Sequence, residues 1–459
     1  MNRIAGRAWV LLLIVAILFG GVGFFLYEYV HESENWVLHS GSPHVYQGPN
    51  QTVAMGTVTD RDGIFLLNLA DKRTYNTHAA VRMSTIHWLG DRAGYISAPA
   101  LTHYAKELIG FNTINGIYHY GGAGGRISLT LSASVQAAAL EALGNRKGTV
   151  AVYNYKTGEL ICAVTTPTYD PDNVPDFSAD ATNAYEGVYL NRFLQSAYIP
   201  GSIFKLVTTA AALETISDIQ QQTFTCTGTY SFGPDQVTCE RAHGTLDLKK
   251  AMMRSCNCAY AQIAMQLGWE NLEKYVEAYG VTKPVSFDGI TTVRGNFSVK
   301  NAAAVEVAWS AIGQHKDQIN PCAFLMFVGA IAGGGQSAQP YVVQSVTVGG
   351  KTTYAASTTA MERIMPQQTA ETLAALMRNN VTGHYGQEHF NGLTVCAKSG
   401  TGEVGGGKKP NATFTGFVTD EDYPLAFIVC VENAGYGRTV CIPIISKVLA
   451  QCKIVLDGE

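Results

Sequence analysis

Near the N-terminus, twenty consecutive residues carry no charge, and no other feature limits the possible folds of the chain so strongly. Residues 8–27 read AWVLLLIVAILFGGVGFFLY. At 1.5 Å per residue, a helix of this length is about 30 Å long, which matches the hydrocarbon core of a bilayer. We therefore predict a transmembrane anchor over residues 8–27.

The charges that flank this apolar run predict its orientation. Arg3 and Arg7 precede the run, and glutamates follow it. Basic residues favour the cytoplasmic side, so we expect a cytoplasmic stub over residues 1–7 and a single-pass protein of the cell membrane with the rest of the chain outside. A cleaved signal peptide is the alternative, but the run exceeds the usual apolar segment of about 7 to 15 residues, and residues 24–27 offer no small-x-small cleavage pattern.

Composition excludes two classes of protein. Hydrophobic residues make up 47% of the 459 residues and charged residues 15%, whereas an average soluble domain is roughly 25% charged. Such a chain can bury a large core, so intrinsic disorder is excluded. The net charge of -4 offers no basic surface, and we expect no nucleic acid as a partner.

The sequence beyond the anchor divides into three parts. Residues 28–55 are polar and turn-rich, which is typical of a stalk. A small β-rich N-terminal region is predicted over residues 56–147, with a hairpin turn at Asp62-Gly63 and a helical pattern that ends at Gly144. Over residues 148–459, β-type runs at both ends enclose helical segments. This order predicts an α/β fold in which one sheet is assembled from distant segments and covered by helices.

The ten cysteines leave two interpretations open. Cys226 and Cys239 flank a turn-like stretch, and in an exported chain they could form a disulfide or stay as free thiols. Cys256 and Cys258 lie two apart in a predicted helix, which suits core packing better than joint metal binding. The eleven histidines show no HExxH or paired spacing, so we expect no metal site and no cofactor.

The segment YIPGSIFK is the most informative for chemistry. Its Pro-Gly turn places Ser202 at the start of a helix and Lys205 one turn later on the same side. A serine hydroxyl becomes a nucleophile when a base takes its proton, and a lysine amine can act as that base when burial or nearby positive charge lowers its pKa. Alone, Ser-x-x-Lys usually means a helix cap beside a solvated lysine. In this sequence the pattern occurs once.

Two further motifs follow in order. Ser255 and Asn257 form Ser-x-Asn, and Lys398, Ser399, Gly400 and Thr401 lie in a β-type run. A serine and an asparagine two apart can extend proton transfer and hold a substrate amide. A strand that carries lysine and then hydroxyl residues can bind a carboxylate and offer backbone N–H groups to an oxyanion.

The ordered motifs resemble those of penicillin-binding proteins of the monofunctional (class B) transpeptidase kind. The resemblance extends over residues 56 to 450, and it includes GTLDLKKAMMRSCNCAYAQIA, SAIGQ and AKSGTGEV. It implies a serine transpeptidase/β-lactamase-like domain, a small N-terminal pedestal, and a peptidoglycan D,D-transpeptidase that β-lactam antibiotics acylate. It also implies two partners: stem peptides ending in D-Ala-D-Ala, and a membrane-embedded glycan polymerase.

The resemblance assigns roles to the motif residues. Ser202 would be acylated, Lys205 would be its general base, and Ser255 would relay protons. Asn257 would contact the substrate backbone, Lys398 would add positive charge, and the Ser399-Gly400-Thr401 segment would hold the terminal carboxylate. The backbone N–H groups of Ser202 and Thr401 would form the oxyanion hole.

Other functions share these motifs. A D,D-carboxypeptidase or serine β-lactamase uses the same acylation machinery, although a β-lactamase needs a dedicated base for water and seldom carries a pedestal and an anchor. A sensor-type or inactive scaffold is the third alternative, but a sensor would need a longer cytoplasmic segment and a dead scaffold would be expected to lose a motif residue. Two departures from the family pattern concern loop shape: Asn320 replaces threonine before Pro321, and residues 405–409 are glycine-rich.

Overall fold

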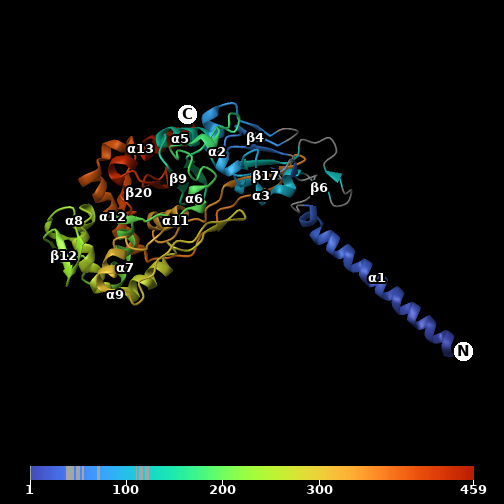
Figure 1. Ribbon diagram of the computed structural model, residues 1–459, viewed down its shortest axis with the longest axis horizontal. Helices are drawn as coiled ribbons and strands as arrows, with labels where there is room; N and C mark the ends of the chain where they lie inside the picture. The colour runs from blue at the N-terminus through green and yellow to red at the C-terminus, as the bar shows by residue number, and fades with distance from the viewer. Residues whose placement is uncertain are drawn as a thin grey trace.

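In the computed structural model, a long N-terminal helix projects from a folded body (Figure 1). The structure describes residues 2–37, 46–47, 52–53, 56–69, 73–109, 111–112, 117–118 and 124–458. Half of the predicted stalk, residues 28–55, lies outside the described residues. Its described parts are the end of the first helix and the short strands β1 (Tyr46–Gln47) and β2 (Thr52–Val53).

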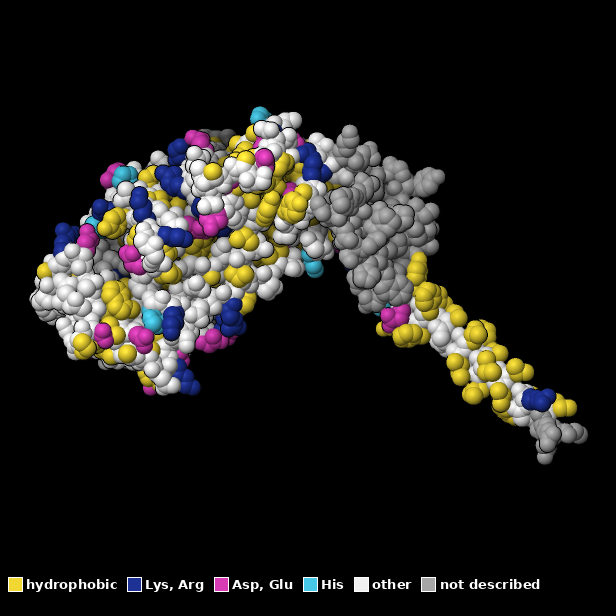
Figure 2. Space-filling model, viewed as in Figure 1, with side chains coloured by type: hydrophobic (Ala, Val, Ile, Leu, Met, Phe, Trp, Pro, Cys, Tyr) yellow, Lys and Arg dark blue, Asp and Glu magenta, His cyan; other side chains and the backbone are white. Residues whose placement is uncertain are grey.

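Helix α1 (Asn2–Val37) contains the predicted membrane span. Its segment Ile4–His31 has 28 residues, and 0% of the most apolar part of this segment is buried. Figure 2 shows hydrophobic side chains along the visible face of this helix. An exposed helix that is apolar all round needs an apolar surrounding, and its length fits a bilayer. The helix is therefore long and apolar enough to be the predicted anchor.

A five-stranded antiparallel sheet forms the centre of the body. Its order is β10-β9-β21-β20-β19, so β19 and β10 are the edge strands. The strands come from both ends of the region 148–459, as predicted. Their bounds are β9 (Gly148–Asn154), β10 (Leu160–Thr166), β19 (Val395–Gly402), β20 (Asn411–Val418) and β21 (Leu425–Val431).

Helices cover both faces of this sheet. Successive side chains of a strand point to opposite faces, and on β9 Val152 packs in one core with α5 (Ala133–Leu143) and α13 (Gly437–Asp457). Tyr153 packs in the other core. Helix α13 is itself apolar enough to span a membrane, but it lies against β20 and β21. The helices of the second core are α7 (Lys205–Thr215), α9 (Asn257–Ala278) and α11 (Pro321–Ala332).

The N-terminal region is built on a six-stranded sheet of order β18-β17-β8-β3-β4-β5. Its β3–β4 hairpin turns at Asp62-Gly63, as predicted, and the Asp60 carboxylate accepts backbone N–H groups within the turn. Strands β17 and β18 come from the middle of the region 148–459, so the two regions share strands. The predicted division after residue 147 stays a prediction. The strands are β3 (Thr57–Thr59), β4 (Phe65–Asn68), β5 (Thr74–Tyr75), β8 (Arg126–Leu129), β17 (Val343–Val348) and β18 (Lys351–Ala355).

A small lobe at the end of the body farthest from α1 carries β12 and α8 (Figure 1). All ten cysteines of the chain are free thiols, so the disulfide between Cys226 and Cys239, left open by the sequence, is absent. The lobe consists of β11 (Thr223–Cys226), β12 (Thr229–Phe232), β13 (Asp235–Thr238), β14 (Gly244–Asp247) and α8 (Leu248–Met253). Further helices are α2 (Ala79–Leu89), α6 (Arg192–Gln195), α10 (Ala304–Ser310) and α12 (Gln367–Asn380).

Candidate active site

The predicted nucleophile, Ser202, lies in a short 3-10 helix, η2 (Gly201–Phe204), that leads directly into α7. Gly201 has a φ of +58°, and a Cβ on it would lie 2.3 Å from the carbonyl oxygen of Thr401. Only glycine fits this left-handed backbone at such a close approach. The Pro-Gly turn therefore seats Ser202 against strand β19, which carries the third motif.

Lys205 is fully buried and joins the first motif to the second. Its Nζ donates to the Ser255 carbonyl oxygen at 2.6 Å and to the Asn257 Oδ1 at 2.8 Å, and it lies 3.2 Å from the Ser255 Oγ. Ser255 has a φ of +51°, which serine seldom adopts, and Asn257 begins α9. Both side chains of Ser-x-Asn therefore meet the same amine.

Lys398 approaches the same serine from β19. Its Nζ lies 3.0 Å from the Ser255 Oγ and 2.7 Å from the Ser399 carbonyl oxygen, and its side chain is fully buried. The Ser255 hydroxyl is thus held between the nitrogens of Lys205 and Lys398. The fold brings together three motifs that lie up to 196 residues apart, from Ser202 to Lys398.

The two lysines have perturbed protonation. Burial lowers the pKa of Lys205 to about 8, although nearby cysteine thiols oppose this shift. Burial, and then the charge of Lys205, lowers the pKa of Lys398 well below its usual range. When two buried amines lie beside one hydroxyl, protonating both is unfavourable, because each charge is desolvated and the two charges repel one another. A lower pKa raises the fraction of the neutral amine, which is the form that a general base requires.

The third motif is shaped by contact with η2. A Cβ on Gly400 would lie 2.3 Å from the Thr413 Oγ1, 2.6 Å from the Pro200 carbonyl oxygen and 2.9 Å from the Ile203 nitrogen, so glycine is required here for space. Because side chains alternate along a strand, Ser399 and Thr401 share one face of β19. Both are half-buried and line the strand beside Ser202.

Sequence comparisons relate the chain to known proteins. The family model described as penicillin binding protein transpeptidase domain matches residues 148–450. Peptidoglycan D,D-transpeptidase PbpA of Mycolicibacterium smegmatis is 30% identical over 341 residues, which are 68% of this chain and 68% of that protein. The chain belongs to the penicillin-binding transpeptidase family. Its predicted monofunctional class is confirmed, and all the predicted site residues lie within the matched range.

Solved structures of the family share the fold. The D,D-transpeptidase domain of a peptidoglycan glycosyltransferase from Eggerthella lenta has a TM-score of 0.74 at 26% identity, and the match covers 88% of this chain and 99% of that one. Penicillin-binding protein A from M. tuberculosis, solved as a ceftriaxone acyl-enzyme, has a TM-score of 0.75 at 23% identity, with 89% and 98% covered. The predicted α/β transpeptidase fold is therefore confirmed.

Two residues that the sequence did not single out as site residues support the third motif of this transpeptidase domain. The Tyr385 hydroxyl accepts the Ser399 backbone N–H and lies 3.0 Å from the Ser399 Oγ. The Gln314 side chain donates to the Thr401 carbonyl oxygen at 2.9 Å. Tyr385 ends a π-helical turn, a feature frequent at functional sites, but no local sequence signal marks it. Gln314 lay in the SAIGQ segment that resembled the family.

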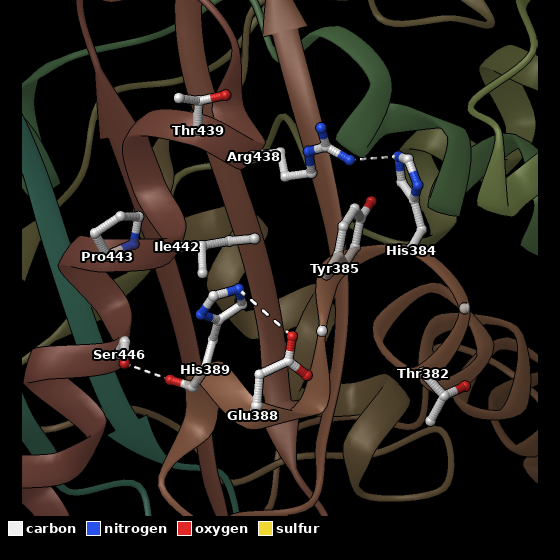
Figure 3. A pocket seen from close by; sticks show the side chains of 12 residues that line it. Thr382, His384, Tyr385, Glu388, His389, Arg438, Thr439, Ile442, Pro443 and Ser446 are labelled. Atoms are coloured by element: carbon white, nitrogen blue, oxygen red, sulfur yellow. Dashed lines mark hydrogen bonds and ion pairs between the residues drawn. The ribbon is translucent and has the colours of Figure 1, made fainter.

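A hollow of about 720 Å³ lies on the far side of the π-helical turn that ends at Tyr385 (Figure 3), and no residue of the three motifs lines it. Tyr385 lines the hollow and also contacts Ser399, so this one residue connects the hollow with the third motif. At one side of the hollow, Arg438 and His384 contact one another, with an Arg438 Nη1 to His384 Nε2 distance of 3.2 Å. Glu388 and His389 line the opposite side. The hollow is therefore polar and carries both signs of charge.

The departure at Asn320 has a structural explanation. Asn320 is the N-cap of α11, and its Oδ1 accepts the backbone N–H groups of Cys322 and Ala323. Its Nδ2 also donates to the Phe193 and Ser196 carbonyl oxygens, at 3.1 Å and 2.9 Å. Threonine could supply the cap but not these donors. Asparagine therefore ties α11 to the segment that leads into η2.

Proposed function

We propose that the protein is a serine D,D-transpeptidase that cross-links peptidoglycan stem peptides through an acyl-Ser202 intermediate, at the serine that penicillin acylates. The observation that carries this proposal is the Ser255 hydroxyl, which lies 3.2 Å from the Lys205 Nζ and 3.0 Å from the Lys398 Nζ. These groups form a proton path beside Ser202. Membership of the penicillin-binding transpeptidase family supports the same reaction.

In the acylation step, Lys205 takes the Ser202 hydroxyl proton while the Oγ attacks the carbonyl carbon of the penultimate D-alanine. The peptide C–N bond breaks, and a proton returns through Ser255 to the departing amine of the terminal D-alanine. In the second step, an amine of another stem peptide attacks the acyl-enzyme. A new peptide bond forms, and Ser202 regains its proton. The reaction balances without a cofactor.

The remaining motif residues bind the substrate in this proposal. The hydroxyls of Ser399 and Thr401, with the Lys398 amine behind them, hold the terminal carboxylate. Gly400 keeps this strand close to the nucleophile, and the Asn257 amide contacts the substrate backbone. The backbone N–H groups of Ser202 and Thr401 stabilise the oxyanion.

The site operates outside the cell membrane in this proposal. Arg3 and Arg7 before the apolar segment of α1 favour a cytoplasmic N-terminus, which leaves the catalytic region on the far side, where peptidoglycan lies. A membrane-embedded glycan polymerase is the proposed partner, because a monofunctional transpeptidase needs glycan chains made elsewhere. α1 and the N-terminal sheet are the surfaces nearest the membrane in this arrangement.

The test is intact-mass labelling of the full-length chain in detergent with penicillin, followed over hours. A stable adduct is expected on the wild type and on the control Ser357→Ala, which changes an exposed serine, and its loss is expected in Ser202→Ala. Rapid loss of the adduct from the wild type would instead favour a hydrolase. If folded wild-type protein formed no adduct, the result would contradict the transpeptidase proposal and favour an inactive scaffold.

Transfer to an amine needs a separate measurement. The acyl-enzyme formed with a D-Ala-D-Ala stem peptide is offered a second stem peptide, and a cross-linked product is expected by mass spectrometry. Release of the shortened peptide alone would favour a D,D-carboxypeptidase.

A further inference from the structure

Three cysteines and a histidine converge in the small lobe, outside the catalytic groups. They are Cys226, Cys239, His243 and Cys256, and their ligand atoms all lie within 4.8 Å of one another. Cys226 ends β11, Cys239 follows β13, His243 precedes β14 and Cys256 is the N-cap of α9. Four separate backbone segments therefore deliver their side chains to one point.

The distances within this cluster fit tetrahedral coordination. With metal–sulfur bonds of about 2.3 Å and metal–nitrogen bonds of about 2.0 Å, a tetrahedral Zn²⁺ site separates two sulfurs by roughly 3.8 Å and a sulfur and a nitrogen by roughly 3.5 Å. The His243 Nδ1 lies 3.6 Å from the Cys226 Sγ and 3.4 Å from the Cys239 Sγ, and the Cys239 and Cys256 sulfurs are 3.9 Å apart. We propose that Cys226, Cys239, His243 and Cys256 bind one structural Zn²⁺ ion.

Neither disulfide formation nor apolar packing explains the cluster as well. A disulfide needs its sulfurs about 2.05 Å apart, whereas those of Cys239 and Cys256 are 3.9 Å apart. Apolar packing alone gives no reason for an imidazole nitrogen to face two thiols at 3.4 Å and 3.6 Å. Soft thiolates with one imidazole are a ligand set that selects zinc.

The surroundings of Cys239 suit a thiolate ligand. The Cys239 sulfur lies beside the start of α9, 3.9 Å from the Sγ of Cys256, the N-cap of that helix. Amides at a helix N-terminus stabilise negative charge, and such outer-shell donors orient metal ligands. Cys226 and Cys256 are buried, and Cys239 and His243 are half-buried. Four protein ligands leave no open position, so the ion would be structural and not catalytic.

The proposed ion would hold the second catalytic motif in place. Cys256 lies between Ser255 and Asn257, and the Asn257 Nδ2 donates to the Thr238 carbonyl oxygen at 2.8 Å, next to Cys239. Binding of zinc would therefore fix the start of α9 relative to β11 and β13. Cys256 is a positioning residue in this proposal, because it acts on Ser255 and Asn257 only through the backbone.

The experiment measures metal content, which does not depend on catalysis. The full-length chain is purified in detergent from zinc-supplemented cells without chelator, and zinc per chain is measured by plasma mass spectrometry. About one ion per chain is expected in the wild type and in the control Cys322→Ala, which removes a buried thiol of α11 remote from the cluster. Zinc is expected to be lost in Cys239→Ser and His243→Ala.

A second measurement protects the conclusion if a variant fails to fold. The wild-type chain is stripped with a chelator under reducing conditions and titrated with Co²⁺ alone, and absorption bands of tetrahedral cobalt-thiolate are expected, displaced by Zn²⁺. A reduced, folded wild-type chain that binds neither ion overturns the proposal. A purified chain without zinc whose intact mass is lower by two hydrogens, with the difference abolished in Cys239→Ser, overturns it in favour of a disulfide. Penicillin labelling of the same samples reports separately on the proposed function.

Discussion

The reactivity of Ser202 depends on a proton leaving a buried lysine. Burial lowers the pKa of Lys205 to about 8, and its Nζ lies 2.8 Å from the Asn257 Oδ1 and 3.2 Å from the Ser255 Oγ. The amine is mostly protonated below this pKa and neutral above it. Only the neutral amine can accept the hydroxyl proton, so the pKa of one residue sets the pH range of the reaction.

We therefore expect the rate of penicillin acylation to rise with pH and to level off above about pH 8. The measurement is the second-order acylation rate constant by stopped-flow or intact mass between pH 6 and pH 9. Lys205→Arg keeps the positive charge but stays protonated, so its rate should fall by roughly 100-fold or more. A wild-type rate that does not change across this range would contradict the role of Lys205 as base.

Asp317 is another buried ionisable residue, and its effect is on stability. It is 1% exposed, and neither of its carboxylate oxygens accepts a hydrogen bond from the described residues. Burial raises its pKa well above the usual range, and the neighbouring Ser310 opposes this shift only in part. Below the unfolded-state pKa of about 3.9 the carboxyl is protonated in both states. As pH rises toward the folded-state pKa, the unfolded state ionises more readily and stability is lost.

Asp317→Asn should consequently stabilise the chain at neutral pH and have little effect near pH 4. The free energy of unfolding at pH 8 is expected to rise by about 1 to 3 kcal/mol. This gain is detected as a higher thermal midpoint of the full-length chain in detergent. A loss of stability of the same size at both pH values would contradict this account.

At the scale of elements, the contact between η2 and β19 positions the nucleophile. Gly201 and Gly400 are two points of close approach, where an added Cβ would lie 2.3 Å and 2.6 Å from backbone oxygens. Gly407, in the glycine-rich loop that follows β19, has a φ of +71° and would meet nothing within 4 Å. The loop at Gly407 therefore has space for a side chain, whereas the contact between η2 and β19 has none.

Gly400→Ala should push η2 away from β19 and lower the penicillin acylation rate by roughly 100-fold, because a displacement of about 1 Å at a reacting group has an effect of this size. The matched control is Gly407→Ala, which imposes only the strain of a left-handed alanine, about 1 kcal/mol, and should acylate normally. Equal rates for the two variants would show that the glycine contact does not position Ser202.

The catalytic motifs were predictable because each is a short pattern of residues that lie at most three positions apart in the sequence. The contact of Tyr385 with Ser399 could not be predicted from the sequence. Tyr385 lies in a π-helical turn, and the packing of α12 against β19 brings this turn to Ser399. The cluster around His243 was also missed. Its members lie on four segments, and its one close pair, Cys239 and His243, is four residues apart and joins two different residue types, so a search for paired histidines or paired cysteines passes over it. The sequence left open whether Cys226 and Cys239 form a disulfide, because it did not show that His243 and Cys256 lie beside them.

At the scale of the molecule, the N-terminal sheet and the catalytic region form one continuous core. Val58 and Ile127 of the N-terminal strands belong to the same buried cluster as Tyr153 and helices α7, α9 and α11. Strand β17 pairs with β8, and the Thr130 backbone N–H donates to the Val342 carbonyl oxygen at 2.9 Å. Pairing over such sequence distance cannot be read from local patterns, which is why the sequence predicted two consecutive regions.

A fragment of residues 148–459 should for this reason be less stable than one of residues 56–459. Without β8, strand β17 keeps β18 but loses its partner on the other side, and the apolar side chains beneath it are exposed to water. We expect the thermal midpoint of the shorter fragment to be lower by roughly 5 °C or more, with a lower soluble yield. Equal midpoints would instead support two independent domains divided after residue 147.

The catalytic strand β19 is also an edge of its sheet, and this position creates a risk of self-association. An uncovered edge offers N–H and C=O groups to a second copy of the chain. Here the Ser399 N–H is taken by Tyr385, the Ser399 carbonyl by Lys398 and the Thr401 carbonyl by Gln314. By the alternation of an antiparallel ladder, the Thr401 N–H points the same way and stays available to a ligand. The side chains that shape the site thereby also act as gatekeepers against aggregation, and leave room for an extended peptide only where the chemistry takes place.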